Sequence, residues 1–187
     1  DVIFTGSDPA ITYSWTNNNT SIGLAANGTG DLLAFTAQNT SDIQVFATVT
    51  VTPSLNGCSG DPQSYDITVN PSPEMLVPVD QTICVTNNTT DIIFSSNVVG
   101  TFYSWVNDNP LIGLVASGTG DIPSFATINS TSSLDTANIT VTPSFNGCDG
   151  PSISFQIIVT PILQVDPIVS DDYCAGYDFP GVSFTGN

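Results

Sequence analysis

The chain has 187 residues, of which 40% are hydrophobic, and its two tryptophans, five tyrosines and ten phenylalanines are enough for a packed core. It has no lysine, arginine or histidine, and sixteen aspartates with one glutamate give a formal net charge of −17 at pH 7. This charge excludes a nucleic-acid-binding protein, because no side chain can neutralise a phosphate. The sequence also lacks an apolar run of about eighteen residues, so it contains no membrane-spanning segment.

The expected strands can be followed in chain order by their alternating apolar and polar side chains. In the first half, "YSW" at 13–15 and the runs at 47–52 and 65–69 have the period of two that is typical of strands. Asn56-Gly57 lies between the last two runs and predicts a hairpin turn. The same elements return at 103–105, 137–142, 146–147 and 155–159, after a short apolar run at 92–94.

The two halves are copies of one repeat with a period of 90 residues. Trp15 matches Trp105 and Cys58 matches Cys148 at this spacing, and the register needs no gap. We therefore predict an all-β chain of tandem immunoglobulin-like β-sandwich domains, each of about 90 residues. The predicted domains are 1–72, which lacks its first strand, 73–162, which is complete, and 163–187, which begins a third repeat.

One loop is repeated almost letter for letter, as "GLAANGTGD" at 23–31 and "GLVASGTGD" at 113–121. As a turn, it uses glycines for backbone angles that other residues resist. As a metal site, Asp31 and Asp121 would supply oxygen ligands to calcium, which a wholly acidic chain would favour. No Asp-x-Asp-x-Asp pattern accompanies the loop. The turn is therefore the preferred interpretation, and calcium, the one cofactor considered, is the alternative.

The four cysteines indicate an oxidising, extracellular environment. They fall at two positions of the repeat, and the absence of both histidine and knuckle spacing argues against zinc. We predict a disulfide between Cys84 and Cys148, which keeps the bond within the one complete unit. The alternatives are Cys58–Cys84, across the joint between units, and pairing with cysteines of repeats beyond this sequence.

The sequence does not predict an enzyme. Without histidine or lysine, no serine or cysteine has an evident base to activate it. The repeated aspartates lie in expected turns and are not arranged as a glycosidase pair. Trp15 and Trp105 could stack on a carbohydrate, but each lies in mid-strand in phase with a tyrosine, which predicts burial in the core.

The strings that carry a family resemblance are "YSWTNNNTSIGLAANGTGDLLAF", "ATVTVTPSLNGCSG" and "YDITVNPSP". With their second copies, they resemble the PKD-like, immunoglobulin-like tandem repeats of large Bacteroidota cell-surface proteins, including relatives of the gliding-motility adhesins. The resemblance covers essentially the whole sequence. It implies a β-sandwich fold, export through the type 9 system and display at the cell surface. Asp135-Thr136-Ala137 also resembles the short O-glycosylation pattern of these bacteria, which makes Thr136 a candidate glycosylation site.

These features predict a non-catalytic stalk segment of a large repetitive adhesin, which extends a binding tip from the cell and supports adhesion or gliding. The alternative is a subunit of an extracellular filament, in which strands from neighbouring copies complete the partial repeats. The expected partners are neighbouring repeats of the same chain, other copies in a filament, and a surface or glycan ligand that binds outside this sequence.

Overall fold

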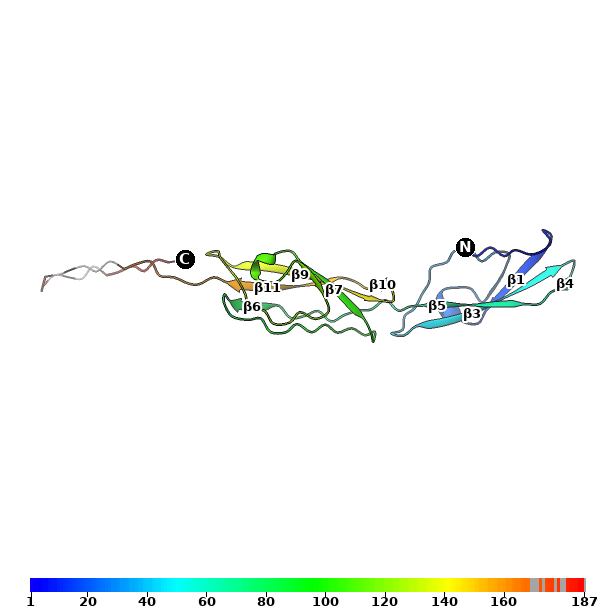
Figure 1. The fold of residues 1–187 in the computed structure, drawn as a ribbon, viewed down its shortest axis with the longest axis horizontal. Helices are drawn as coiled ribbons and strands as arrows, with labels where there is room; N and C mark the ends of the chain where they lie inside the picture. Colours follow the sequence, from blue (N-terminus) through cyan, green and yellow to red (C-terminus); the bar gives the residue numbers. More distant parts are fainter. Residues whose placement is uncertain (169–171, 173, 177, 179–180, 187) are drawn as a thin grey trace. The chain divides into compact units, whose positions relative to one another are not determined.

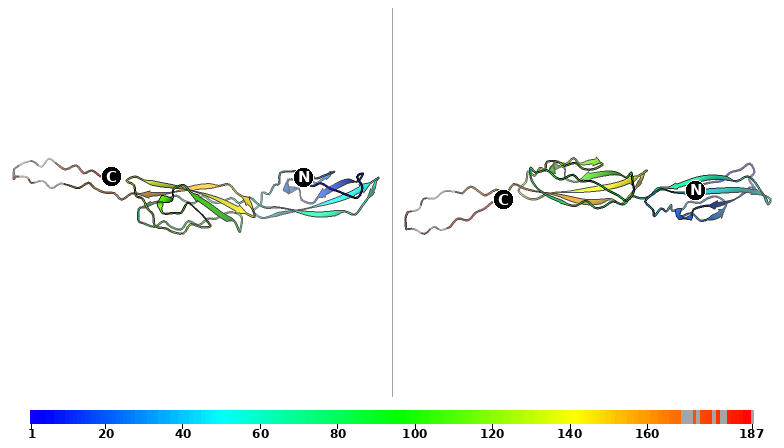
Figure 2. Two further views of the ribbon diagram at one scale, coloured as in Figure 1. Left: turned by 45° about the horizontal axis from the view of Figure 1, so that its top comes forward. Right: turned by 90° about the horizontal axis from the view of Figure 1, so that it is seen from below.

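The computed structural model describes residues 1–168, 172, 174–176, 178 and 181–186. Its regular elements in these residues are strands and two three-residue 3-10 helices, so the predicted all-β class is confirmed. The chain divides into two compact units, one built mainly from residues 1–75 and the other mainly from the residues after 75. One sheet lies in the first unit, and most of the second sheet lies in the second unit, although β10 and the end of β9 are grouped with the first. The strands can be followed by colour in Figures 1 and 2.

The first sheet has five strands, and all of its pairings are antiparallel. Its strands are β1 (Thr12–Asn17), β2 (Asn27–Thr29), β3 (Val45–Leu55), β4 (Cys58–Ser59) and β5 (Gln63–Val69), with the 3-10 helix η1 (Thr20–Ile22) after β1. β1 lies between β2 and β3, and β4 and β5 also pair with β3. β3 is therefore the central strand, with Trp15 opposite Val51 on one side and Ile67 opposite Ala47 on the other.

The second sheet repeats this pattern and adds one strand. Its members are β6 (Gln81–Cys84), β7 (Phe102–Asn107), β8 (Ser117–Thr119), β9 (Asp135–Phe145), β10 (Cys148–Asp149) and β11 (Ile153–Thr160), with η2 (Pro110–Ile112) after β7. The order is β6-β11-β9-β7-β8, and β10 pairs with β9. β6 is the added strand, and it runs parallel to β11. The first sheet has no counterpart of β6 among the described residues.

Alternation along the central strands produces one apolar face on each sheet. In β9, Ala137, Ile139 and Val141 are each 0% exposed, whereas Asn138 between them is exposed. β-branched side chains fit this half-buried, pleated surface well. The alternating runs predicted at 137–142 and 155–159 fall within β9 and β11 and are confirmed.

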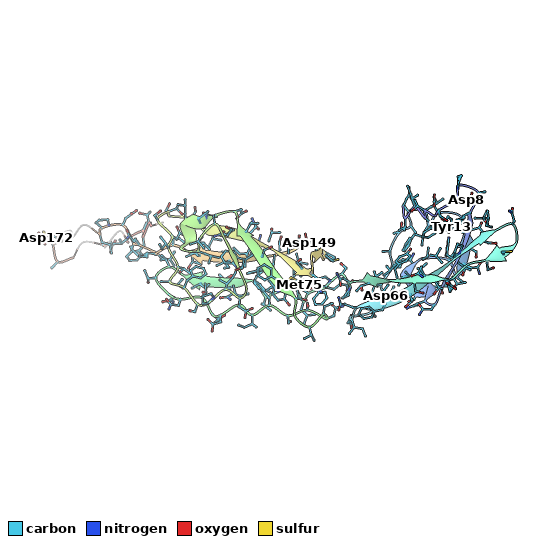
Figure 3. All side chains as sticks on the ribbon, turned by 45° about the vertical axis from the view of Figure 1, so that its right-hand side comes forward. Asp8, Tyr13, Asp66, Met75, Asp149 and Asp172 are labelled. Atoms are coloured by element: carbon cyan, nitrogen blue, oxygen red, sulfur yellow. The ribbon has the colours of Figure 1, made fainter. Side chains whose placement is uncertain are left out.

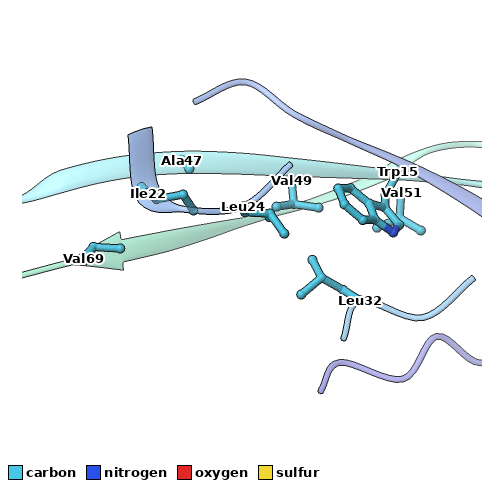
Figure 4. Packing of buried hydrophobic residues seen from close by; sticks show 8 residues of the cluster. All are labelled: Trp15, Ile22, Leu24, Leu32, Ala47, Val49, Val51 and Val69. Atoms are coloured by element: carbon cyan, nitrogen blue, oxygen red, sulfur yellow. The ribbon is translucent and has the colours of Figure 1, made fainter. Parts of the chain in front are cut away.

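A second layer of extended chain lies over the apolar face of each sheet. In the first unit this layer is joined by an isolated bridge between Val2 and Leu32. Figure 4 shows Leu32 facing Trp15, Val49 and other core side chains, and Leu32 is only 3% exposed. The run predicted as a strand at 92–94 belongs to the same layer of the second unit, but it makes only a single bridge, between Ile92 and Ile122.

The predicted hairpin turns are present between β3 and β4 and between β9 and β10. Asn146 and Gly147 have φ values of 47° and 80°, and Asn56 and Gly57 have values of 51° and 84°. Two successive positive φ angles are characteristic of a two-residue hairpin turn that matches the twist of its strands. The Asn-Gly dipeptide is favoured here because both residues tolerate this left-handed region.

Candidate functional site

The repeated loop packs directly on the buried tryptophan of its own unit. Gly28 in β2 lies opposite Trp15 in β1, and a Cβ on Gly28 would overlap the indole ring. Gly118 and Trp105 repeat this arrangement in β8 and β7. The tryptophans are 8% and 6% exposed, which confirms that they belong to the core. Glycine is required at this loop position because the ring occupies the space where a side chain would begin.

The second glycine of "GTGD" makes the turn that the sequence predicts. Gly30 and Gly120 have φ values of +72° and +68°, which residues with a Cβ rarely adopt. The Gly30 N–H donates to the Tyr13 carbonyl at 2.8 Å, and the Gly120 N–H donates to the Tyr103 carbonyl at 2.9 Å. The turn interpretation is therefore confirmed for these two glycines.

The aspartate of the loop holds the extended segment of the second layer. Asp31 Oδ1 accepts a hydrogen bond from the Phe4 N–H at 2.9 Å, and Asp121 Oδ1 accepts one from the Phe94 N–H at 2.8 Å. Among the described residues, no group of three or more His, Cys, Asp or Glu side chains could hold a metal ion. Both aspartates thus have a structural partner, and their role as calcium ligands stays a prediction.

The asparagines that follow each tryptophan fix the next turn of the chain. Asn107 is 5% exposed, and its Nδ2 donates to the carbonyls of Leu114 at 2.9 Å and Val115 at 3.3 Å. Its Oδ1 accepts from the Asn109 N–H at 3.0 Å. Asn109 then caps η2, with its Oδ1 accepting from the Leu111 N–H at 3.2 Å. No chemical motif in the sequence singles out these asparagines, although they stand at the same place in both repeats.

Asp108, which lies between Asn107 and Asn109, forms two hydrogen bonds with the central strand β9 of the second sheet. Asp108 Oδ2 accepts from the Asn138 side-chain amide at 2.7 Å, and Oδ1 accepts from the Asn138 N–H at 2.7 Å. These two hydrogen bonds lower the pKa of Asp108 below its ordinary value. In the first unit Asn18 stands here instead, and its Oδ1 accepts from the Thr48 N–H at 2.7 Å.

We expect Asp108 to stabilise the second unit in a pH-dependent way. Because its pKa is lower in the folded state, its contribution is fully present above its unfolded pKa of about 3.9 and is lost as the pH falls through the lower folded value. The stability advantage of the wild type over Asp108→Asn should therefore be constant near neutral pH and shrink below about pH 4. Thermal unfolding of both proteins from pH 7 to pH 3 measures this, and an advantage that did not change with pH would contradict the assignment.

The predicted disulfide between Cys84 and Cys148 is not present, and all four cysteines are unbonded. Cys84 lies opposite Thr160, the last residue of β11, whereas Cys148 precedes Ile153, the first residue of β11. The seven steps from Ile153 to Thr160, at about 3.3 Å each, span roughly 23 Å. A disulfide requires a Cα separation of about 4.4–6.8 Å, so this pair cannot bond within one sheet. The alternative pair, Cys58 and Cys84, is also unbonded.

The candidate glycosylation residue, Thr136, lies on the outer face of the second sheet. It is exposed and sits in β9 opposite Ile158 of β11. Its backbone carbonyl accepts a hydrogen bond from Asn109 Nδ2 at 3.1 Å, which leaves the side chain out of that contact. Modification at Thr136 stays a prediction.

An apolar groove of about 570 Å³ opens in the first unit. Its walls come from the extended segment at 2–7, from Tyr13 of β1, from Val51 and Pro53 of β3, and from the start of β5. Tyr65 of β5 also lines it, and its buried hydroxyl has no hydrogen-bond partner. Burial raises the pKa of Tyr65 above its ordinary value. Figure 3 labels Tyr13 and, beside it, Asp8, which follows the extended segment.

Comparison with known proteins relates the first part of the chain to one family of extracellular domains. A search of curated proteins found no match. In the described part of the chain, no helix is long and apolar enough to cross a membrane. The PKD-like domain is a structural, non-catalytic type of module with an immunoglobulin-like fold, typically found outside the cell. Residues 2–73, which contain the whole first sheet, match the family model of the PKD-like domain.

Proposed function

We propose that this chain is a stalk segment of a large repetitive adhesin of Bacteroidota, exported by the type 9 system and displayed at the cell surface. The PKD-like match and the all-β fold support an extracellular structural module. The 90-residue repeat supports a tandem array, and the array would hold a binding tip away from the cell for adhesion or gliding.

The observation that carries this proposal is that the repeated residues make structural contacts within their own repeat. In "GTGD", Gly118 makes room for Trp105, Gly120 turns the chain, and Asp121 holds Phe94. Each of these contacts stays within a single repeat. Because these contacts build the fold of each repeat, the repetition of "GTGD" does not require a ligand. The repeats would instead serve to lengthen the chain and to display its binding tip.

Surface labelling of intact cells tests the proposal. An antibody raised against residues 73–162 should label unpermeabilised cells of the native source, and mild protease treatment should remove the label. Labelling that required permeabilised cells would contradict display at the surface. An antibody against a cytoplasmic protein of the same cells provides the control for membrane integrity.

The alternative function is a filament subunit whose partial repeats are completed by neighbouring copies. The observation that favours it is the free edge of β5, which pairs only with β3 among the described residues. An exposed strand edge can accept a strand from another chain. Light scattering on the purified chain separates the two proposals, because filament subunits would grow into polymers as the concentration rises.

The positions of the cysteines support successive repeats joined by covalent bonds. Cys84 lies beside Thr160, where the chain leaves the second sheet. Cys148 lies at the opposite end, close to Gly150, whose position abuts the carbonyl of Pro73 where the repeat begins. Neither thiol therefore has the other within bonding reach in its own repeat. We therefore infer that the disulfides form between successive repeats, as the third of the pairings considered above.

A chain in which residues 73–162 occur twice in succession tests this inference. Under oxidising conditions, the Cys84 of the first copy should bond to the Cys148 of the second, and Cys84→Ser in the first copy should abolish the bond. Non-reducing peptide mapping detects it after digestion at aspartate, since the chain has no lysine or arginine for trypsin. Complete alkylation of both thiols after oxidation would contradict the inference.

A further inference from the structure

The first compact unit is not confined to the first repeat. Besides residues 1–75, it contains two segments of the second repeat, 96–102 and 143–151. The first of these segments leads into β7, and the second carries the turn between β9 and β10. We call the two segments together the clamp, because their contacts within this unit place them against residues 70–75 and Asp42.

Both prolines of residues 70–75 are buried, although this stretch joins one repeat to the next. Pro71 and Pro73 are less than 2% exposed, and so is Pro143 of the clamp. A Cβ on Gly150 would overlap the carbonyl of Pro73 and lie 3.1 Å from the ring of Pro143. The clamp therefore approaches the backbone of residues 70–75 too closely to carry a side chain at this point.

Asn97 connects the clamp to two other parts of the unit. Its Nδ2 donates a hydrogen bond to Asp42 Oδ1 at 2.6 Å. Its Oδ1 accepts from the Glu74 N–H at 2.8 Å, and its own N–H donates to the Glu74 carbonyl at 3.1 Å. The side chain thus uses both its donor and its acceptor, a combination that an amide provides and a carboxylate does not.

The hairpin part of the clamp accepts two further hydrogen bonds. Asn70 Nδ2 donates to the Asn146 carbonyl at 3.4 Å, and the Ser72 hydroxyl donates to the Asp149 carbonyl at 3.3 Å. Both are long, so each contributes less than the shorter bond between Asn97 and Asp42. Asn70 is also held by the first repeat, because its Oδ1 accepts from Gln44 Nε2 at 2.7 Å.

The residues that contact the clamp are not conserved between the two repeats. At the spacing of 90 residues, the counterparts of Asp42, Asn70 and Ser72 are Ser132, Thr160 and Ile162, and the counterpart of Asn97 is Ser7. The carboxylate acceptor and the amide donor therefore occur as a matched pair at this one place. Repetition of the fold alone does not account for them.

We propose that Asp42, Asn70 and Ser72 form a recognition surface for the clamp, and that the first unit reaches its full stability only when the clamp is in contact with it. The surface presents one carboxylate acceptor and two side-chain donors, and it fits a partner segment that offers an amide donor and two backbone carbonyls. Contacts with a neighbouring repeat add to the stability of a repeat in this way. The inference goes beyond the proposed function, because it rests on contacts inside one compact unit and not on display at the cell surface.

Exchanging the donor and the acceptor of the Asn97–Asp42 pair tests the proposal on the full chain. Asn97→Asp keeps the oxygen that accepts from Glu74, but it removes the donor and sets two carboxylates against each other. The unfolding equilibrium constant of the first unit should therefore rise by about three- to tenfold. The double variant, Asn97→Asp with Asp42→Asn, returns a donor to the pair and should restore the wild-type value.

Fluorine NMR of the fluorotryptophan-labelled chain in urea follows the two units separately, since Trp15 lies in the first unit and Trp105 in the second. The matched control is Asn87→Asp, the same chemical change at an exposed residue of the second unit that forms its hydrogen bonds through its backbone. This control should leave the transition of Trp15 unchanged.

A Trp15 transition that moves in Asn97→Asp and returns in the double variant supports the proposal. An unchanged Trp15 transition in Asn97→Asp overturns it, and so does a shift that Asp42→Asn fails to reverse. If Asn97→Asp prevented folding altogether, recovery of the folded chain in the double variant would support the pairing, and no recovery would overturn it. Failure of cell-surface labelling would contradict the proposed stalk and leave this result as it stands.

Discussion

Gly118→Ala is expected to destabilise the second unit by about 2–3 kcal/mol, because its Cβ would overlap the indole of Trp105. The indole ring has little freedom to move away from the added methyl group. Trp105 and Gly118 are paired across β7 and β8, and Trp105 Nε1 also donates to the Gly120 carbonyl at 3.1 Å. Urea denaturation followed by tryptophan fluorescence measures the loss. The emission of Trp105 should shift as the ring leaves its buried position.

The neighbouring glycine provides a matched control. Gly120 has a φ of +68°, but no atom lies within 4 Å of the position where its Cβ would be. Gly120→Ala should therefore cost only the backbone strain, on the order of 1 kcal/mol. Equal losses for Gly118→Ala and Gly120→Ala would show that the tryptophan contact is not what requires glycine in the loop.

Asn17→Asp is expected to destabilise the first unit by about 3 kcal/mol at neutral pH. Asn17 is 7% exposed, and its Nδ2 donates to the carbonyls of Asn19 and Leu24, each at 3.0 Å. Aspartate has nearly the same shape, but it cannot donate and would place a buried negative charge beside two carbonyl oxygens. Scanning calorimetry should show a lower unfolding temperature for the first unit.

The next residue offers the control with the same chemical change. The Asn18 side chain accepts a hydrogen bond from the Thr48 N–H, and the second repeat carries Asp108 at this place. Asn18→Asp should therefore change stability by less than about 0.5 kcal/mol. If both substitutions were equally mild, donation by Asn17 to the two carbonyls would not be holding the turn.

The strands could be predicted from sequence wherever the information is local. The alternation in β9 and β11 and the Asn-Gly turns depend on residues a few positions apart, and these predictions are confirmed. The parallel pairing of β6 with β11 joins residues 76 positions apart, from Gln81 to Ile157, and no local pattern reports it. The apolar run at 92–94 has the local pattern of a strand, but whether it pairs depends on a distant segment, and in the described residues it makes only an isolated bridge from Ile92 to Ile122.

Within the "GTGD" loop, too, only the local requirements could be predicted from sequence. Its turn glycines, Gly30 and Gly120, could be predicted because a positive φ is a local requirement. Gly28 and Gly118 are glycines for a different reason, the tryptophan on the neighbouring strand, which only the register between strands shows.

The cysteines show what an internal repeat does and does not reveal. Matching positions establish that Cys58 and Cys148 are equivalent in the fold, but equivalence says nothing about which thiols are close. Membership of the same repeat predicts a bond between Cys84 and Cys148, but the strand register places these two cysteines at opposite ends of the repeat. Pairing within a repeat therefore failed for a geometric reason that composition and spacing do not contain.

The central claim, a stalk built from tandem repeats, is tested most directly by the denatured mass of the protein in its native source, measured without and with reduction. The account predicts a reduced mass many times that of one 90-residue repeat, carried by a single chain. A reduced mass near 19.5 kDa would contradict it, and the function would then be that of a small subunit.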